Sequence, residues 1–199
     1  MDGKPDTNVR MNLVLASTSP RRLSLVERLG ISPARVAAPD IDENPLKDES
    51  PRAYALRLAE QKARAVSRAP DEIVLAGDTT IALGRRILPP ADTHEIQRDL
   101  LNKLSGRRHH CLSAVCVIDS HGTARIKLAD TIVAFKRLHP QEIQAYIDCG
   151  EGLGKAGGYA IQGRAEAFVR FLSGSHSGVI GLPLFEARAL LKAAGLPLV

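Results

Sequence analysis

Two short apolar runs, each followed at once by polar residues, constrain the fold of this chain most strongly. LVLA (13–16) leads into STSP, and IVLA (73–76) leads into Gly77-Asp78-Thr79. Continuous apolar runs of this length are typical of strands that are buried on both faces. Helical patterns occupy the chain between them, so the order strand, helix, strand predicts an α/β fold.

Turn and capping residues divide the rest of the chain into further elements. The first helix begins near Pro20 and stops at Gly30, and a longer helix runs from Pro51 to about residue 67 with Ser50 as its cap. The other predicted elements are a strand near residue 36, a helix after residues 92–95 that ends at 105–106, a hairpin of residues 111–118 and 124–135, a helix over 140–149, strands near 167–172, and a closing helix over 184–194.

The length and composition bound the kind of protein. A chain of 199 residues suffices for one sizeable domain, so residues 12–199 are predicted to form a single domain after a loose extension over 1–11. Three cysteines without a C-x-x-C pair argue against a disulfide framework and a structural zinc site. No apolar leader and no long apolar run occur, so we expect a cytoplasmic protein without membrane spans. The formal charge of +5 favours an anionic partner.

A candidate phosphate site lies where the first strand passes into the first helix. Ser17, Ser19, Arg21 and Arg22 bring hydroxyl groups, guanidinium groups and the free N–H groups of a helix start to one place. The alternative is an ordinary capped helix with solvated arginines. These residues alone do not decide between the two interpretations.

Three further positions carry candidate acid, base or metal chemistry. Lys62 interrupts an apolar i, i+4 stripe and would need an anionic partner, unless its amine reaches water past the edge of the core. Asp78 directly follows a predicted strand, where it could act as a general base or metal ligand or only form a turn hydrogen bond. Asp42 and Glu43 offer more carboxylates for magnesium, although such an acidic loop is often merely solvated.

Other function classes lack their signatures. No G-x-x-x-x-G-K-[ST] motif occurs, and GSHSG near Ser175 has a histidine where a nucleophile elbow needs serine. Aromatic residues make up only 4% of the chain, which disfavours a stacking platform for single-stranded nucleic acid. We therefore expect no nucleic-acid partner.

The motifs taken together resemble the Maf family in order and spacing. They are LASTSPRR (15–22), ESPRAYALRLAEQKARAV (49–66), AGDTT (76–80), KLSGRRH (103–109), GGYAIQGRA (157–165) and GLPLFE (181–186). The resemblance covers nearly everything from Leu13 onward. It implies an elongated mixed β-sheet with flanking helices that form two lobes around a nucleotide-binding cleft. It also implies a nucleoside triphosphate pyrophosphatase that cuts dTTP or UTP between the α- and β-phosphates.

The resemblance also implies roles for individual residues and a divalent cation, Mg²⁺ or Mn²⁺. Asp78 matches the family's proposed proton acceptor, with Lys62 beside it as the second catalytic residue. The metal would be held by Glu43 and Asp78. The residues implied to hold phosphates or to select the substrate are Ser17, Arg22, Lys62, Arg21, Thr79 and Gln162. The family likeness further suggests a homodimer.

One departure from the family pattern leaves an alternative open. Pro90 stands where the family commonly has a lysine, and a lost charged hydrogen bond would reduce activity about ten- to a hundredfold. Arg85 or Arg86 could substitute for it. The rival interpretation is a nucleotide-binding regulatory protein of cell division or septum formation in which catalysis is weakened.

Overall fold

A mixed seven-stranded sheet forms the centre of the computed structural model, which describes residues 11–198. The strand order is β2-β1-β3-β5-β6-β7, and β4 pairs with the far part of β3. β1 runs parallel to β2 and β3, whereas all other pairs are antiparallel. The strands are β1 (Asn12–Leu15), β2 (Arg35–Val36), β3 (Glu72–Leu83), β4 (Arg86–Leu88), β5 (Arg108–Ile118), β6 (Ala124–Phe135) and β7 (Val169–Ser173).

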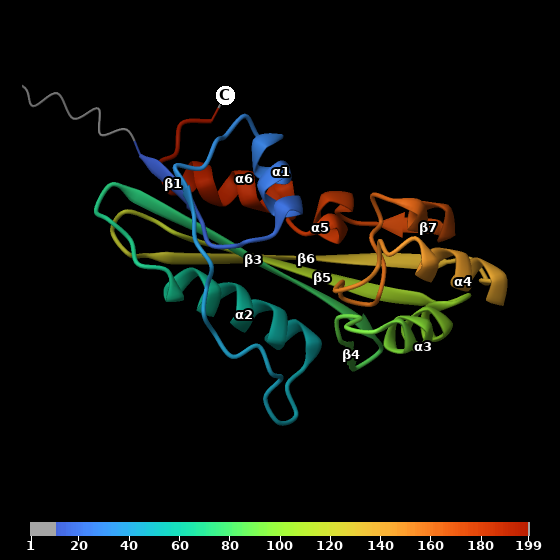
Figure 1. Cartoon of the computed structure of the whole chain (residues 1–199). Helices are drawn as coiled ribbons and strands as arrows, with labels where there is room; N and C mark the ends of the chain where they lie inside the picture. Colours follow the sequence, from blue (N-terminus) through green and yellow to red (C-terminus); the bar gives the residue numbers. More distant parts are fainter. Residues whose placement is uncertain (1–10, 199) are drawn as a thin grey trace, which may run out of the picture.

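Helices lie on both sides of this sheet, as Figure 1 shows. They are α1 (Pro20–Glu27), α2 (Pro51–Ala65), α3 (His94–Leu104), α4 (Pro140–Asp148), α5 (His176–Ile180) and α6 (Leu184–Ala193), with a 3-10 helix η1 (Arg164–Phe168) before β7. The predicted elongated, mixed α/β architecture is confirmed. The predicted extension over residues 1–11 lies, apart from Met11, outside the described residues.

Helix α2 covers one face of the sheet through small side chains. Ala55, Ala59 and Ala63 recur every fourth residue and are fully buried against strand residues such as Ala76 and Ala114. Alanine lets the helix backbone approach the strands closely and still removes apolar surface from water. The Ser50 side chain caps the helix by accepting from the Ala53 N–H, as the sequence predicts.

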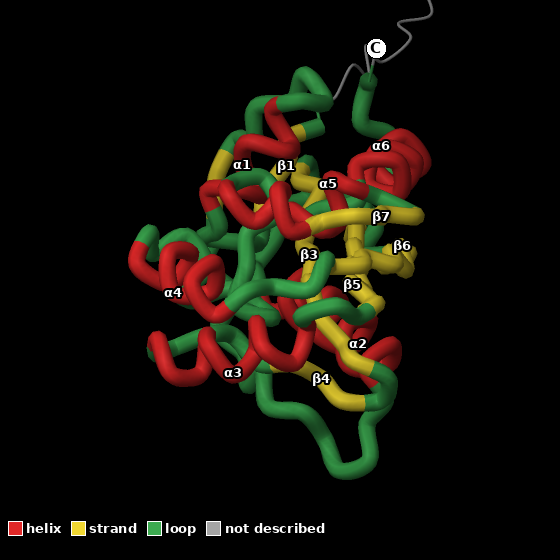
Figure 2. Tube along the Cα trace, turned by 90° about the vertical axis from the view of Figure 1, so that its right-hand side faces the viewer, coloured by secondary structure: helices red, strands yellow, loops and turns green. Residues whose placement is uncertain are grey.

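The opposite face carries the larger core. Leu15, Leu75 and Val115 point to this side and pack with residues of α1, α3, α4 and α6. Phe135 lies within a cluster of edge-to-face aromatic rings that includes Tyr159. Helices α3 and α4 lie side by side in both views (Figures 1 and 2), at the end of the sheet away from β1.

The structure corrects the expected position of Asp78. The sequence predicts a strand that ends at residue 76 with Asp78 just beyond it, but β3 continues to Leu83 and contains Asp78. Parallel pairing with β1 stops at Leu75, whereas antiparallel pairing with β5 continues from Val74 to Ala82. Asp78 therefore lies past the end of the parallel part of the sheet but inside a longer antiparallel ladder.

Three short elements, β4, α5 and η1, were not predicted, and η1 includes residues 167 and 168, where a strand was expected to begin. Within the part of the chain that the structure describes, no helix has both the length and the apolar character that crossing a bilayer requires.

Candidate active site

A crevice with two adjoining hollows lies beside the middle of β3. The larger hollow, of about 390 Å³, is lined by Pro45, Pro89 and Pro90 and by polar residues of the 42–44 loop, and we call it the proline hollow. The smaller, of about 170 Å³, is lined by Arg21 and Arg22, and we call it the arginine hollow. The residues that line both hollows are Glu43, Asp78, Thr79, Pro90 and Ala156.

A buried ion pair occupies the junction of the two hollows. Lys62 Nζ lies 2.9 Å from Asp78 Oδ1, and each side chain is only 8% exposed. Strand alternation turns Asp78 toward α2, and the helical i, i+4 spacing places Lys62 one turn after the buried Leu58. The predicted anionic partner of Lys62 is therefore Asp78, in preference to an amine that reaches past the core edge to water.

Asp78 has a second partner that the sequence analysis missed. Thr80 lies two residues along the strand, hence on the same face, and its hydroxyl donates to Asp78 Oδ2 at 2.9 Å. Both carboxylate oxygens are thus held. The signal in the sequence was the i, i+2 spacing, which becomes informative only once Asp78 is known to lie inside a strand.

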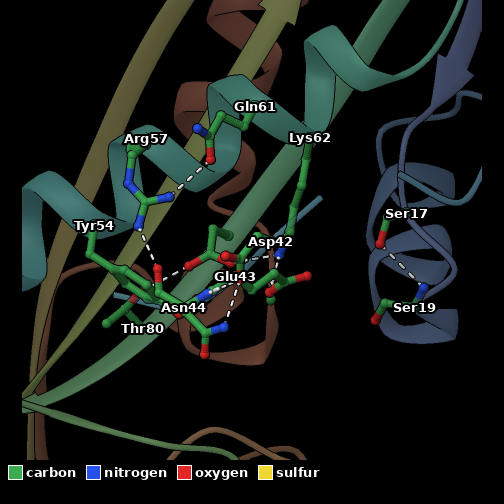
Figure 3. Close-up of polar contacts among 12 residues, drawn as sticks. Ser17, Ser19, Asp42, Glu43, Asn44, Tyr54, Arg57, Gln61, Lys62 and Thr80 are labelled. Carbon is green, nitrogen blue, oxygen red and sulfur yellow. Dashed lines mark hydrogen bonds and ion pairs between the residues drawn. The ribbon is translucent and has the colours of Figure 1, made fainter. Parts of the chain in front are cut away.

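Glu43 reaches the same lysine from the acidic loop. Its Oε2 accepts from Lys62 Nζ at 2.8 Å, and its side chain is 54% exposed (Figure 3). The Tyr54 hydroxyl donates to the Glu43 carbonyl at 2.8 Å. One ammonium group therefore holds together two carboxylates from segments far apart in the sequence.

An arginine on α2 fixes the loop that carries Glu43. Arg57 donates through Nε and Nη2 to the two oxygens of Glu49, at 2.7 Å each, and Nη2 also donates to the Asn44 carbonyl at 3.1 Å. Bidentate pairs of this kind restrict orientation as well as distance. Asp42, which also lies in the proline hollow, accepts from the Asn44 N–H at 2.9 Å. The sequence analysis did not single out Arg57.

The predicted phosphate site at the start of α1 forms part of the arginine hollow. Arg22 donates through Nη1 to the Ser17 hydroxyl at 3.2 Å and through Nε to the Gly181 carbonyl at 2.9 Å. Ser19 gives the helix no side-chain cap. The pKa of Arg22 is lowered because the side chain is buried, and the negative charges of Asp78 and Glu43 offset part of that shift. This end of the crevice therefore combines cationic side chains with an uncapped helix start.

The remaining predicted residues lie in three different places. Arg21 and Thr79 line the crevice, and Thr79 also donates to the Gly181 carbonyl at 3.3 Å. Ser17 is buried behind Arg22. Gln162 lies in an exposed turn and lines neither hollow, so its role in base selection stays a prediction.

Two polar side chains of the arginine hollow were not among the predicted site residues. Lys155 comes from the glycine-rich segment between α4 and η1. Tyr159 belongs to the same segment, and its hydroxyl lies 2.8 Å from Nε2 of the buried His109. His109 lies on β5, and strand alternation turns its ring into the core, a position that the sequence analysis did not single out.

The carboxylates at the junction of the hollows are oxygen ligands of the kind that magnesium and manganese bind. No group of three or more His, Cys, Asp or Glu side chains in residues 11–198 could enclose a metal ion. Magnesium, however, commonly binds through one or two carboxylates together with substrate phosphate oxygens and water. Glu43 and Asp78, adjacent at the junction of the hollows, fit a cation of that kind.

Comparisons with known proteins show which family this chain resembles. The family model described as Maf-like protein matches residues 12–194. A dTTP/UTP pyrophosphatase of Sphingopyxis alaskensis is 67% identical over 94% of this chain and 98% of its own length. One of the same name from Novosphingobium aromaticivorans is 62% identical over 92% of each chain.

A structural comparison gives a more distant similarity. A HAM1 protein from Coxiella burnetii aligns with a TM-score of 0.49 at 14% identity, over 92% of this chain and 99% of that chain. The family model and the curated relatives span nearly all of the described residues. This chain belongs to the Maf family.

Proposed function

We propose that this protein hydrolyses dTTP and UTP between the α- and β-phosphates, giving the nucleoside monophosphate and pyrophosphate. The observation that carries the proposal is the contact of the buried Lys62 ammonium with both Asp78 and Glu43 at the junction of the two hollows. The substrate is suggested by the relatives of 67% and 62% identity that are named dTTP/UTP pyrophosphatase.

The charges of the crevice suit a triphosphate. Arg21, Arg22 and Lys62 line the arginine hollow, and guanidinium groups bind phosphate oxygens through paired N–H donors. These groups would neutralise charge on the phosphates. Reactions of this kind depend mainly on positioning and on electrostatic stabilisation of the transition state.

Asp78 is proposed as the group that orients the attacking water and accepts its proton. The water oxygen forms a bond to the phosphorus while the bridging bond to the pyrophosphate breaks, and the proton moves to the carboxylate. Lys62 and Thr80 hold one Asp78 oxygen each, which fixes the orientation of the carboxylate. Mg²⁺ or Mn²⁺, when held by Glu43 and Asp78, would neutralise further charge on the phosphates.

Domain organisation and partners extend the same proposal. We propose that residues 12–199 act as one domain, supported by a single sheet that extends from β1 to β7. A homodimer and a cytoplasmic location stay predictions. Sedimentation of the purified protein tests the first, because a dimer would have twice the mass of 21.4 kDa.

A panel of nucleoside triphosphates tests the proposed function. The purified protein is incubated with dTTP, UTP, CTP, ATP and GTP, each with Mg²⁺ or Mn²⁺, and pyrophosphate is measured. We expect release that is fastest from dTTP and UTP and absent with a chelator. Tight binding of a triphosphate by calorimetry, with no pyrophosphate from any combination, would instead favour the nucleotide-binding regulatory protein.

A further inference from the structure

A glycine-rich segment beside Pro90 brings one more lysine to the crevice. Pro90 forms an antiparallel bridge with Ala156. Main-chain hydrogen bonds on either side of this bridge run from the Ala91 N–H to the Lys155 carbonyl at 3.1 Å and from the Gly157 N–H to the Pro89 carbonyl at 3.1 Å. The backbone of Lys155 is therefore fixed against the wall that contains Pro90.

Among the described residues, the side chain of Lys155 has no charged partner. Within residues 11–198 it forms no ion pair, and its ammonium donates to the Leu153 carbonyl at 3.2 Å. Burial and the nearby positive charge of Arg21 lower the pKa of Lys155. Arg21 likewise has no carboxylate partner in the described chain. Two unneutralised cations are thus held close together at the arginine hollow.

The lining of the arginine hollow carries more positive than negative charge. Its lining contains the cations Arg21, Arg22, Lys62 and Lys155 but only the carboxylates Glu43 and Asp78. Like charges held together in a partly buried site repel one another, and a bound anion relieves that repulsion. A polyphosphate carries several negative charges and would relieve the repulsion more fully than a monoanion.

The sequence analysis suggested two arginines as substitutes for the lysine that is missing at Pro90, but neither lies in the crevice. Arg85 and Arg86 are exposed at the turn between β3 and β4 and line neither hollow. Lys155, by contrast, immediately precedes Ala156, the bridge partner of Pro90, and lines the hollow. The lysine that Pro90 lacks therefore has a spatial neighbour of the same chemistry.

We propose that Lys155 is a substrate-binding residue that contacts the polyphosphate of the nucleotide and supplies the cation that Pro90 cannot. The inference rests on the proposed function for its natural ligand. It goes beyond that function because it assigns a phosphate contact to a segment that is far along the sequence from the strand-to-helix turn at Ser17.

Pyrophosphate-release kinetics with dTTP and Mg²⁺ test the assignment. Lys155→Ala and Lys155→Gln are compared with wild type, with Lys155→Arg and with Lys127→Ala, which removes the same charge from an exposed position on β6. We expect KM to rise about ten- to a hundredfold in the Ala and Gln variants with kcat changed only a few-fold. The Arg variant should stay within several-fold of wild type, and Lys127→Ala within about twofold.

Inorganic tripolyphosphate and thymidine identify which part of the substrate Lys155 contacts. With Mg²⁺ held constant, calorimetry should show tripolyphosphate affinity falling in Lys155→Ala by about the same factor as KM rises, while thymidine affinity is unchanged. Equal behaviour of Lys155→Ala, Lys155→Gln and Lys127→Ala would overturn the proposal. A loss of thymidine affinity alone would also overturn it. If wild type releases no pyrophosphate, the hydrolase proposal fails, and tripolyphosphate binding still decides the role of Lys155.

Discussion

Lys62 and Asp78 meet at 2.9 Å between Nζ and Oδ1, and both side chains are almost completely buried. Lys62 comes from α2 and Asp78 from the middle of β3. Glu43 adds a second carboxylate at 2.8 Å from the same ammonium. Desolvating charged groups is costly, and a stable arrangement therefore needs this close pairing. The pair is both a structural contact and the proposed reaction centre.

Removal of the lysine should destabilise the fold. Lys62→Met leaves Asp78 buried without its cation, and breaking such a pair costs about 3 to 5 kcal/mol. Urea unfolding at pH 7 measures the change. The double variant Lys62→Met/Asp78→Asn should recover part of the loss because no lone charge remains buried. Equal stability of Lys62→Met and wild type would show that the pair contributes nothing to folding.

The hydrogen bonds from Arg57 that hold the 42–49 loop should matter for activity more than for stability. Arg57→Ala removes the contacts to Glu49 and Asn44 that position the loop, so turnover should fall about tenfold or more. Hydrogen exchange of residues 42–49 should become faster. Arg64→Ala is the matched control, because Arg64 pairs with Glu60 on the exposed side of the same helix. Indistinguishable kinetics and exchange in the two variants would refute a positioning role for Arg57.

Buried His109 should make stability depend on pH. Burial lowers its pKa from 6.5 to about 4, so between these values the unfolded chain binds a proton that the folded chain does not. Its contribution is complete above about pH 6.5 and is lost as the pH falls to about 4, a change of about 3 kcal/mol. The free energy of unfolding of His109→Phe should show a flatter slope over this range. A slope equal to that of wild type would mean that His109 is not the group responsible.

The glycine-rich segment should tolerate no side chain at Gly152. A Cβ there would lie 2.1 Å from the Gly158 carbonyl oxygen and 2.2 Å from Gln97 Nε2. We expect Gly152→Ala to lower the free energy of unfolding by about 3 kcal/mol or more. Gly154→Ala, at a left-handed position with no atom within 4 Å, should cost only about 1 to 2 kcal/mol. Similar losses in both variants would contradict the close packing described here.

The sequence predicted the elements well where a local signal exists. The Ser50 cap, the strands at 13–16 and 73–76 and the hairpin around Gly122 are present because capping, apolar runs and turn residues act over a few positions. The continuation of β3 through Asp78 depends on its pairing with β5, which has no local signature in the sequence. In that pairing Asp78 lies opposite Ala114, which is 36 residues further along the chain. The misplacement of Asp78 at a strand end follows from this.

In the candidate site too, residues with a local signal in the sequence could be predicted, and residues that depend on distant contacts could not. Lys62 and Asp78 could be selected because a charge in an apolar stripe and a carboxylate beside a buried strand stand out locally. Arg57 and Lys155 could not, because an arginine among the other charged residues of a helix and a lysine in a glycine-rich segment are both commonplace. Their importance comes only from tertiary contacts with the 42–49 loop and with Pro90.

The central claim is that the Asp78 carboxylate takes part in the reaction, and the turnover of Asp78→Asn tests it most directly. The variant keeps the shape of the side chain, so binding of a non-hydrolysable α,β-methylene analogue of dUTP, measured by calorimetry, serves as the control. The account predicts that pyrophosphate release from dTTP falls about a hundredfold or more while the analogue still binds. Turnover within about twofold of wild type would contradict it.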